Sequence, residues 1–169
     1  MLMIFGGLPA TGKTTIARSF AARIAATYLR IDSIGQSILG SAWGKLPIDD
    51  VGYRVAYAVA ADNLRLGTTV IADSVNPLSV TREAWIAVAN RAGAKSIEVE
   101  IICSDTNLHR QRLKNRSTHS ADLHPLSWQE VVSREYHLWE SGHTVIDTAK
   151  NSVDESVQIL LAVLDSHKQ

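Results

Sequence analysis

The N-terminal segment MLMIFGGLPATGKTT, residues 1–15, constrains the fold of this chain more than any other stretch. Its continuous apolar run, from Met1 to Phe5, is typical of a strand buried on both faces, as in parallel sheets. Two glycines follow at once, and the Ala-rich residues from about Lys13 to Ala26 predict a helix. A buried strand, a glycine-rich turn and a helix in succession are the setting of a phosphate-binding loop.

The rest of the chain alternates between strand and helix patterns. Further strands are predicted in TYLRID, TTVIAD, KSIEVEIICS and TVID. Helices are predicted in residues 51–66, from Pro77 onward and in the basic run 105–116. Two more helices are predicted to start at capping boxes, formed by Ser127 with Glu130 and by Ser152 with Glu155. The alternation predicts an α/β fold with a doubly wound, parallel, five-stranded sheet and helices on both faces. In residues 51–66, Val51, Val55 and Val59 recur at helical spacing with Tyr53, Tyr57 and Leu64 beside them, which predicts the apolar face of that helix.

Length and composition limit the class of protein. The 169 residues suit a single domain, 1–169, in which the polar segment at about 116–127 is expected to form an arginine-bearing lid. Lys plus Arg and Asp plus Glu are 17 each, and this neutral balance argues against a dedicated nucleic-acid binder. The lone Cys103 excludes an intrachain disulfide and is expected to be a buried thiol. No apolar run reaches the roughly 18 residues of a membrane span, so we expect a cytoplasmic monomer or homodimer without a membrane partner.

The segment GLPATGKT, residues 7–14, matches the phosphate-loop (P-loop) pattern in full. Its glycines let backbone N–H groups point inward at anionic oxygens, and the following helix directs its positive end to the same place. Lys13 adds a charge for the β- and γ-phosphates, Thr14 a hydroxyl for Mg²⁺, and Thr15 is expected at the α-phosphate. The predicted nucleotide-binding residues are Gly7, Pro9, Ala10, Thr11, Gly12, Lys13, Thr14 and Thr15. No Asn-Lys-x-Asp tetrapeptide for guanine occurs. We expect ATP and Mg²⁺, while the choice between ATP and GTP stays open.

Two acids follow predicted strands. Asp32 would lie beside the P-loop, where an ionised carboxylate can accept the proton of an attacking hydroxyl; the alternative is that it caps a helix beginning near Ser33. Asp73 ends the third strand, at the position where an acid usually holds Mg²⁺ through water. Its alternatives are a substrate contact or a turn residue.

The basic segment HRQRLKNR, residues 109–116, places Arg112 and Arg116 on one helix face. The planar fork of arginine matches the oxygens of a transferring phosphoryl group, and a mobile loop after the helix would let the arginines close over the nucleotide. An ordinary solvated basic face is the alternative. Beside a P-loop we expect Arg116, and then Arg112, to bind phosphate.

The segments GGLPATGKTT, RIDSIGQSIL, TTVIADSVNPLSVTREAW and HRQRLKNR together resemble the small P-loop kinases, an AAA-type ATPase/kinase-like group with polynucleotide 5′-kinases, chloramphenicol phosphotransferases, gluconate kinases and zeta-type toxins. The resemblance spans nearly the whole chain. It implies that Lys13 and Thr14 bind nucleotide and Mg²⁺, that Asp32 is the catalytic base, and that Arg116 belongs to the lid. The polynucleotide kinases carry an arginine three residues after the catalytic acid, and here that residue is Gly35.

The missing arginine and the neutral charge favour a small acceptor molecule. We therefore expect an ATP- and Mg²⁺-dependent phosphotransferase acting on a hydroxyl of a small molecule. The alternatives are a polynucleotide 5′-hydroxyl kinase and a non-catalytic nucleotide-binding or regulatory ATPase. Trp43 and Tyr53 could form an apolar wall of the acceptor site, Arg54 could meet an anion, and Arg82 is a further candidate there.

Overall fold

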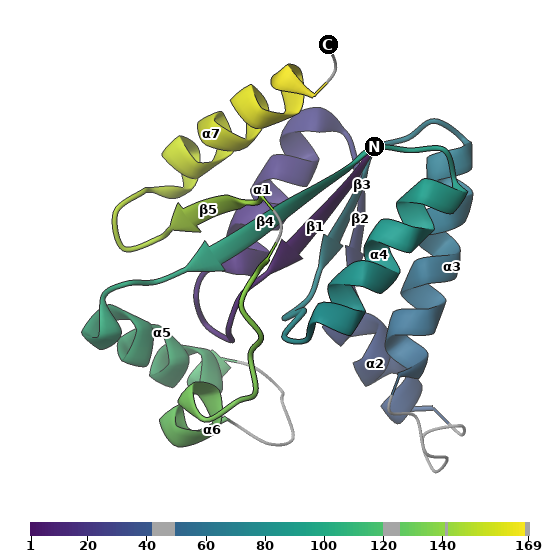
Figure 1. Ribbon diagram of the computed structural model, residues 1–169. Helices are drawn as coiled ribbons and strands as arrows, with labels where there is room; N and C mark the ends of the chain where they lie inside the picture. Colours follow the sequence, from purple (N-terminus) through teal and green to yellow (C-terminus); the bar gives the residue numbers. More distant parts are fainter. Residues whose placement is uncertain (42–49, 120–125, 141, 168–169) are drawn as a thin grey trace.

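The computed structural model is a three-layer α/β fold with one parallel, five-stranded sheet at its centre (Figure 1). It describes residues 1–41, 50–119, 126–140 and 142–167, and for residues 116–119 the backbone alone. The strands are β1 (Leu2–Gly6), β2 (Thr27–Arg30), β3 (Val70–Asp73), β4 (Ser96–Ile102) and β5 (Thr144–Asp147). Their order, β2-β3-β1-β4-β5, puts β1 in the middle. The predicted fold class is confirmed.

Helices cover both faces of the sheet (Figure 1). On one face lie α1 (Lys13–Ile24) and α7 (Val153–Ser166), and on the other lie α3 (Val51–Arg65) and α4 (Ser79–Arg91). Near the carboxyl ends of the strands lie α2 (Ile31–Leu39), α5 (Thr106–His119) and α6 (Trp128–Val132). Among the helices as far as they are described, none is long and apolar enough to cross a membrane.

The central strand explains why the core has two halves. Every residue of β1 is buried, and alternate side chains point to opposite faces of the sheet. Met3 and Phe5 pack with α1 and α7, while Leu2 and Ile4 pack with α3 and α4. The two capping boxes predicted from sequence are both present, at the starts of α6 and α7. The carboxyl ends of the strands are thereby held together on one edge, where ligands of such sheets bind.

Two predictions about local structure were wrong, the first of them in part. In α3 Leu64 is buried and Tyr53 and Tyr57 pack partly buried against the core, as predicted. Val55 and Val59 are instead 40% and 38% exposed, and Ala56 and Ala60 are buried. The helix has two apolar stripes, and the alanine stripe lets its backbone lie closer to the sheet. Cys103 is only partly buried, since it follows the last residue of β4 and has left the sheet.

The alternative in which Asp32 caps a helix is not supported. Helix α2 begins at Ile31, with Arg30 as its N-cap residue, so Asp32 lies inside the first turn and does not cap a helix at Ser33. A carboxylate in this turn is favoured by the positive end of the helix. The position still leaves Asp32 next to the carboxyl end of β2, where the sequence predicted it.

Candidate active site

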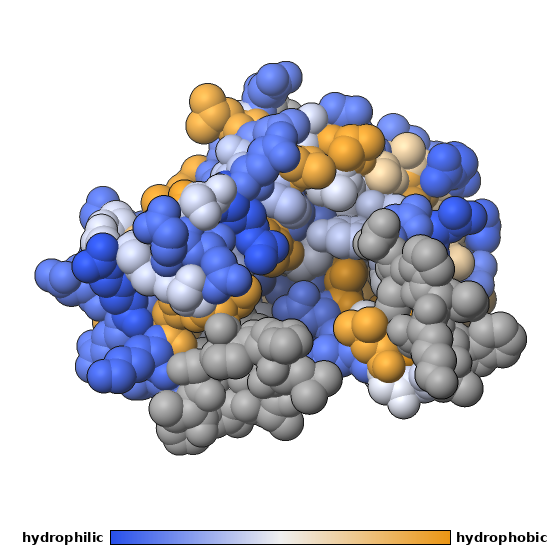
Figure 2. Space-filling model, turned by 90° about the horizontal axis from the view of Figure 1, so that it is seen from below, coloured by the Kyte–Doolittle hydropathy of each residue, from blue (hydrophilic) through white to orange (hydrophobic). Residues whose placement is uncertain are grey.

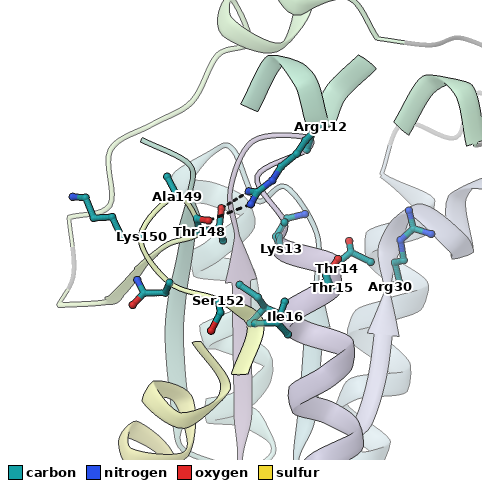
Figure 3. A pocket seen from close by; sticks show the side chains of 14 residues that line it. Lys13, Thr14, Thr15, Ile16, Arg30, Arg112, Thr148, Ala149, Lys150 and Ser152 are labelled. Carbon is teal, nitrogen blue, oxygen red and sulfur yellow. Dashed lines mark hydrogen bonds between the residues drawn. The ribbon is translucent and has the colours of Figure 1, made fainter. Parts of the chain in front are cut away.

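A cavity of about 740 Å³ opens at the carboxyl edge of the sheet, around the P-loop (Figure 3). Its walls come from the P-loop, the start of α1, the end of β2, helix α5 and the segment between β5 and α7. The lining residues are Ala10, Gly12, Lys13, Thr14, Thr15, Ile16, Arg30, Arg112, Thr148, Ala149, Lys150, Asn151, Ser152 and Val153. The predicted P-loop and a C-terminal segment that was not predicted thus form one cavity.

The backbone of the P-loop requires its glycines. Gly7 has φ +140°, and a Cβ there would overlap the carbonyl oxygen of Ile101. Gly12 has φ +96°, and Ala10 takes the same left-handed region at φ +66°. Helix α1 begins at Lys13, directly after Gly12, so its positive end faces the cavity. The geometry is that of an anion-binding loop.

The cationic end of Lys13 lies beside Asp73. The Lys13 Nζ is 3.4 Å from Asp73 Oδ1, and the two side chains are 8% and 1% exposed. This contact is an ion pair by distance, but it lacks hydrogen-bond geometry, so Oδ1 has no hydrogen-bond partner among the described residues. The other carboxylate oxygen, Oδ2, accepts a 2.6 Å hydrogen bond from the hydroxyl of Tyr28. Burial, and then this bond to Asp73, raise the pKa of Tyr28, so the phenol stays a donor at neutral pH.

These side chains fit a magnesium ion that a P-loop fold implies. Mg²⁺ prefers oxygen ligands and usually keeps several waters beside substrate phosphates. The Thr14 hydroxyl lines the cavity, and Asp73 offers the buried oxygen Oδ1. Elsewhere in the described ranges no cluster of three or more His, Cys, Asp or Glu side chains forms a dedicated metal site. The donors present are those of a metal held jointly with a nucleotide.

Asp32 is connected to the cavity through Arg30. The Arg30 Nη2 lies 3.5 Å from Asp32 Oδ2, and Arg30 itself lines the cavity with Lys13 and Thr14. The Asp32 side chain is 41% exposed, so an incoming hydroxyl can reach it. Arg30 was not predicted as a site residue, although it stands two residues before the predicted base in TYLRID.

Arg112 belongs to a hydrogen-bond chain that joins three segments (Figure 3). Its Nη1 donates to Thr148 Oγ1 at 2.7 Å, and its Nη2 donates to the Thr148 carbonyl at 3.2 Å. Thr148 Oγ1 in turn donates to the P-loop carbonyl of Thr11 at 2.7 Å. Arg112 therefore holds the β5–α7 segment against the P-loop in this structure. Its predicted role at a phosphate stays a prediction.

Two more side chains fix the same region. The ring of His109, 5% exposed, places Nε2 at 2.7 Å from the carbonyl oxygen of Pro9, to which it must donate. Asp147 ends β5 and accepts from the N–H and the hydroxyl of Ser104, at 3.0 and 2.6 Å. Burial acts to raise the pKa of Asp147, but the hydrogen bonds from Ser104 and the N–H of Ala149 outweigh it and hold the value at about 2. Neither contact could be predicted from the sequence, beyond the presence of an acid at a strand end.

The remaining predicted residues fall in different places. Trp43 and the side chain of Arg116 lie outside the described residues, as does most of the predicted lid. Arg54 is exposed on α3. Arg82 is 4% exposed; it donates to the carbonyls of Asn76 and Leu138 at 3.2 and 2.8 Å, and its guanidinium stacks on Trp139. These contacts give Arg82 a structural role, and its predicted place in the acceptor site stays a prediction.

A family model described as an AAA domain matches residues 2–134, which is most of the chain. No curated protein matches the chain significantly.

Solved structures share its fold. A protein described as a kinase from Chloroflexus aurantiacus J-10-fl aligns with a TM-score of 0.74 and 22% identity, over 98% of this chain and 96% of its own. A gluconokinase from Sinorhizobium meliloti 1021 aligns with a TM-score of 0.66 and 14% identity, over 97% and 91%. The Mycobacterium tuberculosis APS kinase CysC, in complex with AMPPNP and APS, aligns with a TM-score of 0.64 and 17% identity, over 97% and 96%. At these identities the likeness establishes the fold.

Proposed function

The chain belongs to the AAA domain family, and we propose that it is a phosphotransferase that uses ATP and Mg²⁺ to phosphorylate a hydroxyl of a small molecule. The fold shared with a gluconokinase and an APS kinase supports a kinase, and the AMPPNP bound to the latter supports ATP as donor. Neither likeness identifies the acceptor.

One observation carries the proposal. Arg30 lines the P-loop cavity and also contacts Asp32, at 3.5 Å, so a proton-accepting carboxylate stands at the edge of the nucleotide site. A protein that only binds a nucleotide has no need of an accessible carboxylate on that side, and the water-only blank described below separates hydrolysis from transfer. A kinase needs one to accept the proton of the attacking hydroxyl.

The proposed reaction assigns a role to each side chain. The acceptor hydroxyl gives its proton to Asp32 while its oxygen bonds to the γ-phosphorus of ATP. The bond from that phosphorus to the β–γ bridging oxygen breaks, and ADP leaves. Lys13 moves from Asp73 onto the β- and γ-phosphates, which stabilises the charge that develops there. Thr14 and Asp73 would hold Mg²⁺, which supplies charge neutralisation between the phosphates.

The arginines of α5 have separate roles in this proposal. Arg112 is fixed to Thr148 and so borders the nucleotide cavity on its β5 side. Arg116 lies one helical turn further along α5 and is proposed to reach the γ-phosphoryl group. The substitution Arg116→Ala would then lower transfer without preventing nucleotide binding.

The proposal is tested by Asp32→Asn, with Asp62→Asn as a matched control. Asp62 is an exposed carboxylate on α3 that pairs only with Arg65 in the described part of the chain. We expect Asp32→Asn to lower transfer to an alcohol acceptor by about 10²- to 10⁴-fold, the usual contribution of a general base, with unchanged ATP affinity. ATP consumption is measured against a water-only blank, across a panel of polyols. Full transfer by Asp32→Asn would remove the base from the mechanism, and ATP binding without transfer to any alcohol would refute the kinase.

A further inference from the structure

Ser74 directly follows Asp73 and is 3% exposed. Its hydroxyl oxygen is buried and has no hydrogen-bond partner among the residues that the structure describes. Leaving a buried hydroxyl unpaired costs about 1–3 kcal/mol, so proteins seldom keep such a group without a reason. At the carboxyl end of a central strand, beside the Mg²⁺-binding acid, a bound ligand is the natural partner for it.

Tyr53 lies on the first turn of α3, and its hydroxyl comes near the end of β3. Burial raises the pKa of Tyr53; the Ser74 hydroxyl and the backbone N–H of Asn76 act against this, and the negative charge of Asp32 adds to it. The Tyr53 and Ser74 hydroxyls approach without forming a hydrogen bond of ordinary geometry. With its pKa raised, the phenol stays neutral and can donate to an oxygen of a ligand.

The chain after α6 brings a positive charge to the same place. It is tied to the loop that follows β3, because the N–H of His137 donates to the carbonyl of Pro77 at 2.8 Å. The guanidinium of Arg82 donates to the carbonyl of Leu138 at 2.8 Å and reinforces this attachment. Arg134, three residues before His137, is therefore held beside the Ser74 end of β3.

The guanidinium of Arg134 is available for a ligand. Arg134 is exposed, and no ion pair or hydrogen bond involves its side chain in the ranges that the structure describes. Its charge acts on Tyr53, where it favours ionisation, and on Glu130. Figure 2 views the molecule from the carboxyl edge of the sheet, and this edge is hollowed between the α5–α6 side and the α2–α3 side. Arg134 follows α6 along the chain and Tyr53 lies on α3.

We propose that the phosphate acceptor is a small anionic alcohol, with its anionic group on Arg134 and its hydroxyls on Ser74 and Tyr53. The inference rests on the proposed kinase activity and names its class of substrate. The reacting hydroxyl faces Asp32, and the carboxylate or phosphate of the same molecule meets the fork of Arg134, which suits both groups. Neutral polyols would fill the hydroxyl positions but leave the guanidinium unpaired.

Matched pairs of acceptors test this class. D-gluconate is compared with D-glucitol, and D-glycerate and glycerol 3-phosphate are compared with glycerol, which separates a carboxylate from a phosphate as the preferred anion. Phosphorylated product and ATP consumption are measured for each. We expect kcat/KM to favour an anionic member by about 10- to 100-fold, the usual effect of one hydrogen bond to a charged group. Equal use of neutral and anionic members, or transfer only to a 5′-hydroxyl oligonucleotide, would overturn the inference.

The variant Arg134→Gln assigns the preference to this residue. We expect it to raise KM for the anionic acceptor about 10-fold or more, with KM for ATP unchanged. Arg134→Lys should restore part of the loss. The matched control is Arg91→Gln, another exposed arginine, at the end of α4. An unchanged anion preference in Arg134→Gln would refute the assignment.

A binding measurement separates this inference from the kinase activity. The thermal stability of the full chain is followed with AMP-PNP and Mg²⁺, with and without each acceptor. Stabilisation by the anionic members alone, lost in Arg134→Gln, supports the anion site even where no transfer occurs, and in that case the kinase proposal fails by itself. If no anionic acceptor stabilises the nucleotide complex or accepts phosphate, the anion site is wrong, even if the protein phosphorylates a neutral alcohol.

Discussion

Removing the hydroxyl of Tyr28 should reveal how strongly Asp73, the proposed Mg²⁺ ligand, depends on its surroundings. In Tyr28→Phe the ring still packs against the α1 side of the core, but Asp73 Oδ2 loses its 2.6 Å hydrogen bond. Asp73 is 1% exposed, so water cannot readily replace the donor. A hydrogen bond to a charged group contributes about 1.5–3 kcal/mol, and we expect Tyr28→Phe to lower the free energy of unfolding by about 2 kcal/mol.

Equilibrium urea unfolding at neutral pH measures this loss, and a thermal scan gives a second reading. For a domain of this size, 2 kcal/mol corresponds to a Tm lower by about 4–8 °C. The matched control is Tyr57→Phe, since Tyr57 donates only to the neutral carbonyl of Thr81 at 3.3 Å. That bond is longer and lacks a charge, so the control should lose under about 1 kcal/mol.

The same variant has a functional reading. Without Tyr28 the Asp73 carboxylate is held by Lys13 alone among the described contacts, so its orientation toward Mg²⁺ is less fixed. We expect Tyr28→Phe to need more Mg²⁺ for half-maximal binding of a fluorescent ATP analogue. Equal stability losses in Tyr28→Phe and Tyr57→Phe, together with an unchanged Mg²⁺ requirement, would refute the reasoning.

Three further changes test the P-loop and the segment after β5. Gly7→Ala forces a side chain onto the Ile101 carbonyl at φ +140° and should cost more than about 1 kcal/mol, whereas Gly35→Ala, in open space on α2, should be neutral or stabilising in the same urea assay. Thr148→Val removes the hydroxyl that joins α5 to the P-loop and should raise Kd for ATP about tenfold, as one lost hydrogen bond does. Because the pKa of Asp147 is lowered to about 2, its ionised carboxylate stabilises the fold at pH values above the ordinary Asp pKa of about 3.9, and this stability is lost as the pH falls toward about 2. Asp147→Asn should therefore make the urea midpoint depend less on pH in that range.

The parts of the site that could be predicted from sequence are those that depend on neighbours along the chain. The P-loop needs a strand, glycines and a helix start within about a dozen residues, and all are contiguous here. The capping boxes were predictable for the same reason, because serine and glutamate three residues apart satisfy each other. Asp32 and Asp73 were predictable because parallel strands bring their carboxyl ends to one edge.

The parts that could not be predicted depend on contacts between distant segments. Thr148 meets Thr11 across 137 residues, and His109 meets Pro9 across 100. Nothing in TVIDTAKN marks a threonine whose hydroxyl would bond a P-loop carbonyl. The buried face of α3 was also out of reach, since both its alanine stripe and its valine stripe are apolar and only the distance to the sheet decides between them.

The distribution of unpaired polar atoms distinguishes the two halves of the site. On the nucleotide side, Thr148 and His109 have partners in the protein itself. On the acceptor side, Asp73 Oδ1, Ser74 Oγ and Asn76 Oδ1 are buried without a hydrogen-bond partner, and they are three of only five such atoms in the described part of the chain. Each unpaired atom lowers the free energy of unfolding by about 1–3 kcal/mol. Their concentration at one strand end is typical of a preformed ligand-binding surface. Arg30 Nε, in the nucleotide cavity, is a fourth such atom, so the contrast is one of degree. In the proposed mechanism, Mg²⁺ and the acceptor would supply the missing partners at the end of β3.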